Sequence, residues 1–180
     1  MLRTSGIRTA FIALHGAFGE DGTVQALLES LGIPYTGSGV EASRLAIHKP
    51  TTRMRLAAAG VPVAAGALVP IERLTSEGRG PRGTPMEITR WLAAQGLRLP
   101  VVVKPARQGS SIGLTIVETP AQWPEALKTA AHFDTDLLCE EYLEGPEVTV
   151  GILDETALPV VQIVPQRRFY DYVAKYTPGH

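Results

Sequence analysis

Apolar residues recur with helical spacing in several parts of the chain. Between residues 24 and 31 they fall on one face of a helix, and the glycine that follows suits a left-handed C-terminal cap. Pro50 is well placed as the first residue of another helix, because the N–H that it lacks has no partner there. Thr84 and Thr119 each precede a proline and, three positions on, a Glu or Gln, which is the spacing of a capping box. The expected helices are 24–31, 41–47, 50–59, 84–95 and 119–132.

Short runs of apolar and β-branched residues predict strands between these helices. The runs at 9–14 and 101–103 are expected to be buried, the second of them on both faces of a sheet. The last three runs are joined by turns too short for a crossover, so they are expected to pair antiparallel. The chain is therefore expected to have a mixed α/β (α+β) fold, with strands at 9–14, 61–69, 101–103, 114–117, 136–143, 147–153 and 158–165.

Composition narrows the class of protein without indicating a function. The chain has 180 residues, a formal net charge of −1 and a single cysteine, Cys139. The balanced charge gives no sign of a nucleic-acid partner, and no apolar run reaches the roughly 18 residues that a membrane-spanning helix needs. The first residues lack the apolar region of a secretory signal. We therefore expect a cytoplasmic protein that contacts neither nucleic acid nor membrane.

The stretch from residue 101 to 117 combines a strand, a lysine, a pliant loop and a second strand. Lys104 stands at the end of the first strand, and the loop from Gln108 to Gly113 holds two glycines and two serines. The N–H groups and hydroxyls of such a loop can surround an anion, which makes the stretch a candidate phosphate clamp. It is not a Walker A loop, because the lysine precedes the glycines and no helix follows. A plain hairpin with a solvated lysine explains the same residues, and both interpretations stay open.

Two other segments suit a nucleotide. Lys49 precedes Pro50, so it is expected beside the unpaired N–H groups of a helix start, where a cation is unfavourable unless an anion lies nearby. The alternative is a flexible lysine in water. Residues 140–143 end one strand and Glu147 begins the next, so free main-chain groups can bond an adenine ring and the carboxylate can accept both ribose hydroxyls. Taken alone, this segment favours a solvated acidic hairpin.

A few polar residues remain as candidates for chemistry. His15 and Glu20 lie across a turn and form a candidate acid–base or orienting pair, although a histidine after a strand is more often structural. Ser110 and Ser111 are expected to hydrogen-bond phosphate rather than to act as nucleophiles, because no Ser/His/Asp pattern is present. No spacing of His, Cys, Asp and Glu forms a convincing metal site.

Six motifs together resemble those of the D-alanine–D-alanine ligases, in that family's order and spacing and over nearly the whole chain. The resemblance implies an ATP-grasp fold and the ATP-dependent joining of two D-alanines, through an acyl phosphate, to the dipeptide used in peptidoglycan. The motifs are His15-Gly-x-x-Gly-Glu-Asp-Gly22, Pro34-Tyr-Thr-Gly-Ser-Gly39, Lys49, Val103-Lys-Pro105 with Gly109-Ser-Ser-Ile-Gly113, Glu140-Glu-Tyr-Leu-Glu-Gly-Pro-Glu147 and Phe169-Tyr-Asp-Tyr-Val-Ala-Lys-Tyr176.

The resemblance also implies that Lys49 and Lys104 contact the phosphates of ATP, and that Gly109 to Gly113, with Ser111 among them, form a flap over the triphosphate. It implies an adenine hinge made by Glu140, Glu141, Tyr142 and Leu143, and a ribose contact made by Glu147. Ser110 would close the site together with Tyr176 and, in the family's mobile ω-loop, Lys175, and His15 with Glu20 would lie near D-alanine.

The chain departs from the family at His48, where the family has Asp, at Gln108, where Glu is usual, and at Arg167-Arg168. It is also expected to be an internal piece. We expect a truncated N-terminal α/β domain at 1–47, a small ATP-grasp subdomain at 48–135 and the start of the large subdomain at 136–180. The Mg²⁺ ligands are expected in a part that this chain lacks, so the chain alone is expected to be inactive or nearly so.

Two alternative functions stay open. One is a non-catalytic remnant that binds a nucleotide, and the other is an ATP-grasp ligase whose second substrate is D-lactate or D-serine. The resemblance further implies a bacterial cytoplasmic protein, with a homodimer possible in the full-length family.

Overall fold

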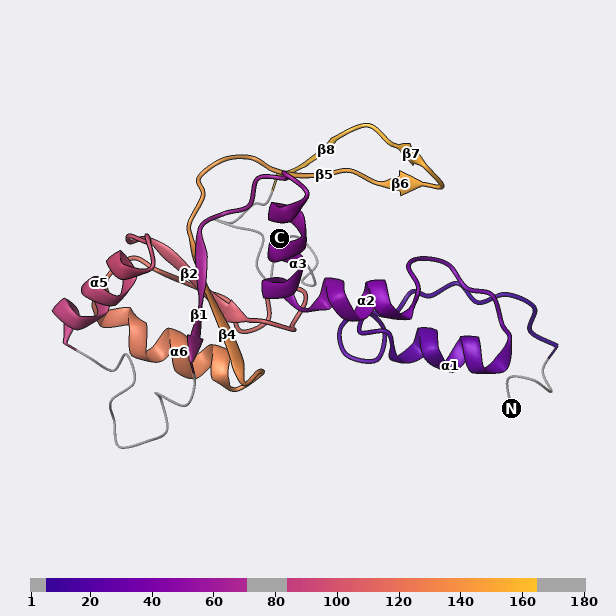
Figure 1. Ribbon diagram of the computed structural model, residues 1–180, viewed down its shortest axis with the longest axis horizontal. Coiled ribbons are helices and arrows are strands. Elements are labelled where there is room, and N and C mark those ends of the chain that lie inside the picture. The colour runs from indigo at the N-terminus through magenta and orange to yellow at the C-terminus, as the bar shows by residue number, and fades with distance from the viewer. Residues whose placement is uncertain (1–5, 71–83, 165–180) are drawn as a thin grey trace.

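The chain combines helices and antiparallel strands, as the mixed α/β prediction required (Figure 1). A computed structural model describes residues 6–70 and 84–164. Two helices near the N-terminus lie to one side of a four-stranded sheet, and two later helices pack against the sheet. The chain then continues into a long hairpin arm, yellow in Figure 1, that extends away from the sheet.

The three N-terminal helices form where the apolar pattern predicts them. They are α1 (Thr23–Leu31), α2 (Val40–Ile47) and α3 (Lys49–Ala58). Helix α1 ends at Gly32, whose left-handed φ of 67° allows its N–H to reach back to the last turn. Val24 and Leu28 of α1 pack with Ile33 in a small cluster. A single residue, His48, separates α2 from α3.

Both predicted capping boxes are present. Thr84 accepts a hydrogen bond from the N–H of Glu87, and the Glu87 carboxylate accepts one of 2.7 Å from the N–H of Thr84. This pair begins α5 (Pro85–Ala94). The box at Thr119 begins a single 3₁₀ turn, η2 (Pro120–Gln122), which leads directly into α6 (Trp123–Ala131).

The sheet has the strand order β1-β4-β2-β3, and every neighbouring pair is antiparallel. Its main core lies on the face covered by α5 and α6, where Val101 and Val103 pack with Leu92 and Trp123. The strands are β1 (Gly66–Pro70), β2 (Val101–Pro105), β3 (Thr115–Val117) and β4 (Asp136–Glu141).

The expectation that residues 101–103 are buried on both faces is wrong. Burial alternates along β2, so that Val101 and Val103 are fully buried while Val102 and Lys104 are only partly buried. Successive side chains of a strand point to opposite faces. The second face is therefore available to a polar site, and a run of three valines could not reveal that difference.

The predicted buried strand at 9–14 is also wrong. Among the described residues its only ladder contact is one parallel bridge between Ala10 and Tyr35, and Phe11 and Leu14 are exposed. A parallel strand needs neighbours that cover it. Here the segment 34–36 bonds it and Ala10 and Ile12 pack against the cluster of α1, while the other side chains stay uncovered. The strand expected at 61–69 begins later than predicted, at Gly66.

The arm after the sheet consists of short antiparallel pairs, which confirms the pairing predicted between 147–153 and 158–165. The pairing expected between 136–143 and 147–153 is wrong, because in the described part of the chain β4 pairs with β1 and β2 instead. The expected strands 147–153 and 158–165 are each interrupted, and several of their apolar side chains, such as Ile152 and Val161, are exposed. The pairs are β5 (Glu147–Thr149) with β8 (Val161–Ile163), and β6 (Ile152–Leu153) with β7 (Thr156–Ala157). Within 6–70 and 84–164, no helix has the length and apolar character needed to cross a membrane.

Candidate functional site

Two lysines that are far apart in the sequence line one cavity. Lys49 is the first residue of α3 and Lys104 lies near the end of β2. With Gly109, Ser110 and Ser111 of the following loop they surround about 190 Å³. The structure thus brings together the lysines and the loop that the sequence suggested as a phosphate clamp.

Lys49 is held in place by main-chain groups of the loop that begins after β2. Its N–H donates to the carbonyl of Ala106 at 3.0 Å, and its ammonium donates to the carbonyl of Gln108. Burial lowers the pKa of Lys49, and the neighbouring charge of Lys104 lowers it further. Two cations in a partly buried cavity repel each other, and an anion between them relieves that repulsion.

The loop between β2 and β3 has an uncommon backbone. Ser110 and Ser111 adopt left-handed φ angles of 52° and 58° although neither is glycine, a conformation found at turns and at sites where the backbone faces a ligand. Gly113 has a φ of 70°, and a Cβ there would lie 2.8 Å from side-chain atoms of Phe133 and Pro105. Glycine is therefore required at position 113 by both conformation and space.

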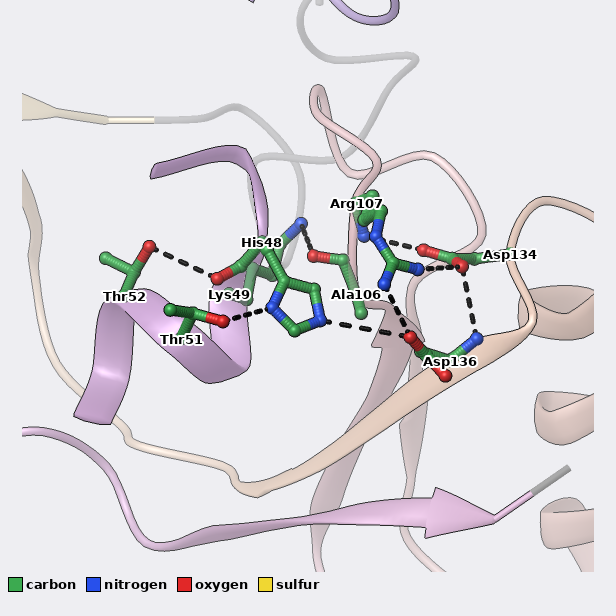
Figure 2. A network of polar contacts seen from close by, with 8 residues as sticks. All are labelled: His48, Lys49, Thr51, Thr52, Ala106, Arg107, Asp134 and Asp136. Atoms are coloured by element: carbon green, nitrogen blue, oxygen red, sulfur yellow. Dashed lines mark hydrogen bonds and ion pairs between the residues drawn. The ribbon is translucent and has the colours of Figure 1, made fainter. Parts of the chain in front are cut away.

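A polar network fixes the start of α3 against the sheet (Figure 2). Arg107 donates to Asp134 at 3.0 Å and to Asp136 at 2.7 Å, and its own N–H donates to Asp134 at 2.7 Å. The His48 ring lies between Thr51, which its Nδ1 contacts, and Asp136, whose carboxylate is 3.9 Å from Nε2. The bonds of Arg107 hold the segment that follows β2, and Lys49 is bonded to that segment through Ala106 and Gln108.

The carboxylate of Glu140 lies on the same sheet face as Lys104 and is almost fully buried. One oxygen pairs with the ammonium of Lys104 and the other with the guanidinium of Arg53. Sequence reasoning assigned Glu140 to the adenine hinge and missed Arg53. The spacing held a signal, because Arg53 follows Lys49 by four positions and so shares its helix face.

The other predicted hinge residues lie at the end of β4, with Glu141 as its last residue. Glu141 accepts a hydrogen bond of 2.7 Å from the N–H of Ala65, and the N–H of Tyr142 donates to Pro100 at 3.3 Å. Together with Leu143 they line an open groove of about 910 Å³, whose opposite wall is the segment 96–100. Glu147 begins β5, is exposed, and lines neither this groove nor the lysine cavity.

The predicted substrate-side residues lie at the turn that precedes α1. The Glu20 carboxylate accepts a hydrogen bond of 2.6 Å from the N–H of Gly16. It also lies next to the flap, since a Cβ on Gly109 would be 3.3 Å from Glu20 Oε2. His15, at the same turn, is exposed. The predicted closing residues Lys175 and Tyr176 lie outside the described residues.

The chain is similar to known proteins over most of its length. The family model described as D-ala D-ala ligase C-terminus matches residues 58–180, and the one described as D-ala D-ala ligase N-terminus matches residues 3–38. The chain is 46% identical over 173 residues to a D-alanine–D-alanine ligase of Geobacter sulfurreducens, covering 96% of this chain and 50% of the relative. For one of Citrifermentans bemidjiense the values are 47%, 96% and 51%.

Solved structures show the same likeness. The D-alanine–D-alanine ligase of Bacillus anthracis matches with a TM-score of 0.75 and 32% identity, over 96% of this chain and 52% of that one. The enzyme of Coxiella burnetii matches with a TM-score of 0.64 and 29% identity, over 79% of this chain and 37% of that one. The fold and the lysine-lined cavity thus define a partial ATP-grasp protein. The chain belongs to the D-alanine–D-alanine ligase family, and it spans about half the length of the curated relatives it matches.

Proposed function

We propose that this chain forms the phosphate-binding part of an enzyme that uses ATP to ligate two D-alanines. The observation that carries the proposal is the cavity in which Lys49 and Lys104 face a glycine- and serine-rich loop. Two ammonium groups and a loop rich in N–H donors suit a polyphosphate. Membership of the ligase family supports the substrates, since its named members are D-alanine–D-alanine ligases.

In this proposal the lysines neutralise the phosphates, and Gly109, Ser111 and Gly113 belong to the flap that covers them. The adenine ring occupies the groove beside Glu141, Tyr142 and Leu143, whose opposite wall is formed by 96–100. Glu140 precedes Glu141 on β4 and so supports the wall formed by residues 141–143. Glu147, at the start of the arm, binds the ribose.

The proposed chemistry has two steps. The carboxylate of one D-alanine attacks the γ-phosphorus of ATP, which releases ADP and leaves an acyl phosphate. The amine of the second D-alanine then attacks the acyl carbon, and the C–O bond to phosphate breaks as the peptide bond forms. The phosphoryl step depends mainly on positioning and charge neutralisation. Lys49 and Lys104 supply that charge, and the flap excludes the water that would hydrolyse the intermediate.

Among the residues that the structure describes, the expected Mg²⁺ has no fitting site. Within 6–70 and 84–164, no three or more His, Cys, Asp or Glu side chains are grouped so that they could hold a metal ion. Charge neutralisation by the described residues therefore comes from lysines and main-chain N–H groups. We propose that the 180-residue chain alone turns over D-alanine and ATP little or not at all, since it spans about half the length of the curated relatives it matches.

The remaining roles concern substrate and closure. We assign Glu20 and His15 to the side of the site that receives D-alanine, because Glu20 lies against Gly109 of the flap. We assign Ser110, together with Tyr176 and Lys175, to closing the site over the acyl phosphate. A reaction that consumes ATP and builds a cell-wall precursor belongs in the bacterial cytoplasm, and the intact enzyme is proposed to be a homodimer.

Titration with ATP tests the proposal. Wild-type chain and a Lys49→Met variant are titrated calorimetrically, with Lys128→Met as a control because Lys128 is an exposed lysine remote from the cavity. We expect ATP to bind the wild type and the control equally and the Lys49 variant at least about tenfold more weakly. Equal affinity of all three proteins would refute phosphate binding in this cavity. Phosphate release with ATP, Mg²⁺ and D-alanine, measured in parallel, should stay at background.

A further inference from the structure

The carboxylate of Glu140 is shared between two cations on the open face of the sheet. Its side chain is 11% exposed, that of Lys104 is 21% exposed and that of Arg53 is 18% exposed. Oε1 pairs with Arg53 and Oε2 with Lys104, so each oxygen has its own partner. Burial of a carboxylate is costly unless it is paired and hydrogen-bonded, and here both requirements are met.

Arg53 is itself fixed from both sides. One terminal nitrogen pairs with Glu140, and the other donates to the main-chain carbonyl of Ala64. The rigid fork of a guanidinium suits this arrangement, because it presents two N–H groups at a set angle, whereas a lysine offers a single ammonium. The contact joins α3, which carries Lys49, to β4, which lies beside the strand of Lys104, and to the segment that leads into β1.

Gly66 of β1 provides the space for this contact. A Cβ at position 66 would lie 3.0 Å from Arg53 Nη2, 3.0 Å from Glu140 Cγ and 2.9 Å from the carbonyl oxygen of Cys139. Gly66 is not among the described residues with a left-handed φ, so its conformation does not call for glycine. The glycine is explained instead by lack of space: the main-chain carbonyl of Cys139 is the nearest atom, and the guanidinium of Arg53 and the side chain of Glu140 lie almost as close.

We propose that Arg53 is a positioning residue for the phosphate-binding Lys104, and that it acts through Glu140. With Arg53 present, Glu140 keeps a cationic partner when the ammonium of Lys104 turns to a phosphate. Without Arg53, Glu140 has only Lys104 as a counter-ion, and a phosphate must compete with a buried carboxylate for that lysine. The inference rests on the proposed function, because it presumes that the cavity receives the phosphates of a nucleotide.

The test compares ligands that differ only in phosphate. The 180-residue chain is titrated with ATP, ADP and adenosine, as wild type and as Arg53→Gln, Arg53→Lys and Arg55→Gln. Arg55 is the matched control, since it lies on α3 and is exposed. We expect Arg53→Gln to weaken ATP about tenfold, ADP less, and adenosine not at all, while Arg53→Lys recovers most of the loss. A general structural defect would weaken all three ligands alike.

A double-mutant cycle with Glu140→Gln tests whether Arg53 acts through Glu140. If Arg53 acts through Glu140, adding Arg53→Gln to Glu140→Gln should leave ATP affinity within about threefold of Glu140→Gln alone. This comparison also serves if Arg53→Gln does not fold, because the double variant has no unpaired buried carboxylate. A further loss of ATP affinity in the double variant, or equal ATP binding by Arg53→Gln and Arg55→Gln, would overturn the inference. Failure of the wild type to bind ATP would instead refute the proposed function.

Discussion

The N–H of Lys49 donates a hydrogen bond of 3.0 Å to the carbonyl oxygen of Ala106, which lies 57 residues further along the chain. This bond joins the first residue of α3 to the residue that follows β2. Because the ammonium of Lys49 also reaches Gln108, both ends of this residue contact the segment that leads into the flap. The position of this lysine, which we propose binds phosphate, is thus set by main-chain atoms.

The glycine at position 113 should be essential to the loop. Gly113→Ala places a methyl group 2.8 Å from Phe133 and Pro105 and forces alanine into a left-handed φ. We expect the free energy of unfolding to fall by about 2–4 kcal/mol. Urea denaturation followed by circular dichroism measures the change.

Gly96→Ala is the control for that experiment. Gly96 has nearly the same φ, 71°, but no atom lies within 4 Å of its Cβ position. Only conformational strain remains, so the loss should be about 1–2 kcal/mol. Equal losses in the two variants would show that the contacts around Gly113 are unimportant.

The lowered pKa of Lys49 makes nucleotide affinity sensitive to pH. Burial, and then the charge of Lys104, lower this pKa below its ordinary value of 10.5. The ammonium is the form that binds phosphate. As the pH rises through the lowered pKa, binding must also take up a proton, so ATP affinity should fall at a lower pH than for an unperturbed lysine.

Lys49→Arg isolates this contribution, because arginine stays charged throughout the range. Calorimetric dissociation constants for ATP, measured between neutral and alkaline pH, should rise less steeply for the variant than for the wild type. Parallel curves would assign the pH dependence to another group.

The stability of the nucleotide-free protein should change with pH in the opposite direction to its ATP affinity. Between the lowered pKa of Lys49 and 10.5, the unfolded chain binds more protons at this residue than the folded chain. The free energy of unfolding should therefore rise with pH in this window relative to Lys49→Met. Urea midpoints of the two proteins, compared at several pH values, give the difference.

Arg107 should contribute to stability far more than a surface ion pair does. Its partner Asp134 has a side chain that is only 6% exposed, so Arg107→Gln leaves a buried carboxylate without its counter-ion. We expect a loss of about 1–3 kcal/mol. Lys128→Gln removes an exposed pair with Glu125 and should cost less than about 0.5 kcal/mol. A thermal melt that ranks the two variants equally would contradict the role given to the network in Figure 2.

Cys139 should be inert in the folded protein. Burial raises the pKa of its thiol to about 12, and the nearby carboxylate of Glu140 raises it in the same direction. Thiolate is the reactive form, so a disulfide reagent at mildly alkaline pH should label the native chain very slowly and the urea-unfolded chain at once. Because the chain has a single cysteine, the absorbance change reports one site. Rapid labelling of native protein would mean that β4 opens readily.

The capping box, which depends only on neighbouring residues, was predicted correctly, whereas the contact between Arg53 and Glu140, which are far apart in the sequence, was not. Thr84 and Glu87 form their capping box within one turn, so a stretch of four residues suffices to predict it. Arg53 and Glu140 are 87 residues apart, and no pattern within either segment indicates that they pair. The family resemblance placed Lys49 and Lys104 in one site, and the structure brings them to one cavity.

Burial was the property hardest to predict. The apolar run at 9–14 has the composition of an inner strand, but its side chains are covered only where other strands lie beside it. In the described part of the chain only Tyr35 pairs with it, through Ala10. Burial of the valines of β2 was also predicted too high, because one face of their sheet carries Lys104 and Glu140.

The junction between α2 and α3 consists of His48 alone, with φ and ψ of −88° and 93°. Two torsion angles thus set the direction of one helix relative to the next. Thr52 bridges the joint by donating to the carbonyl of Leu45 at 2.9 Å, which resists independent bending. Lys49 is the next residue after this joint. The angle between the two helices and the position of one ammonium group are therefore linked through a single residue.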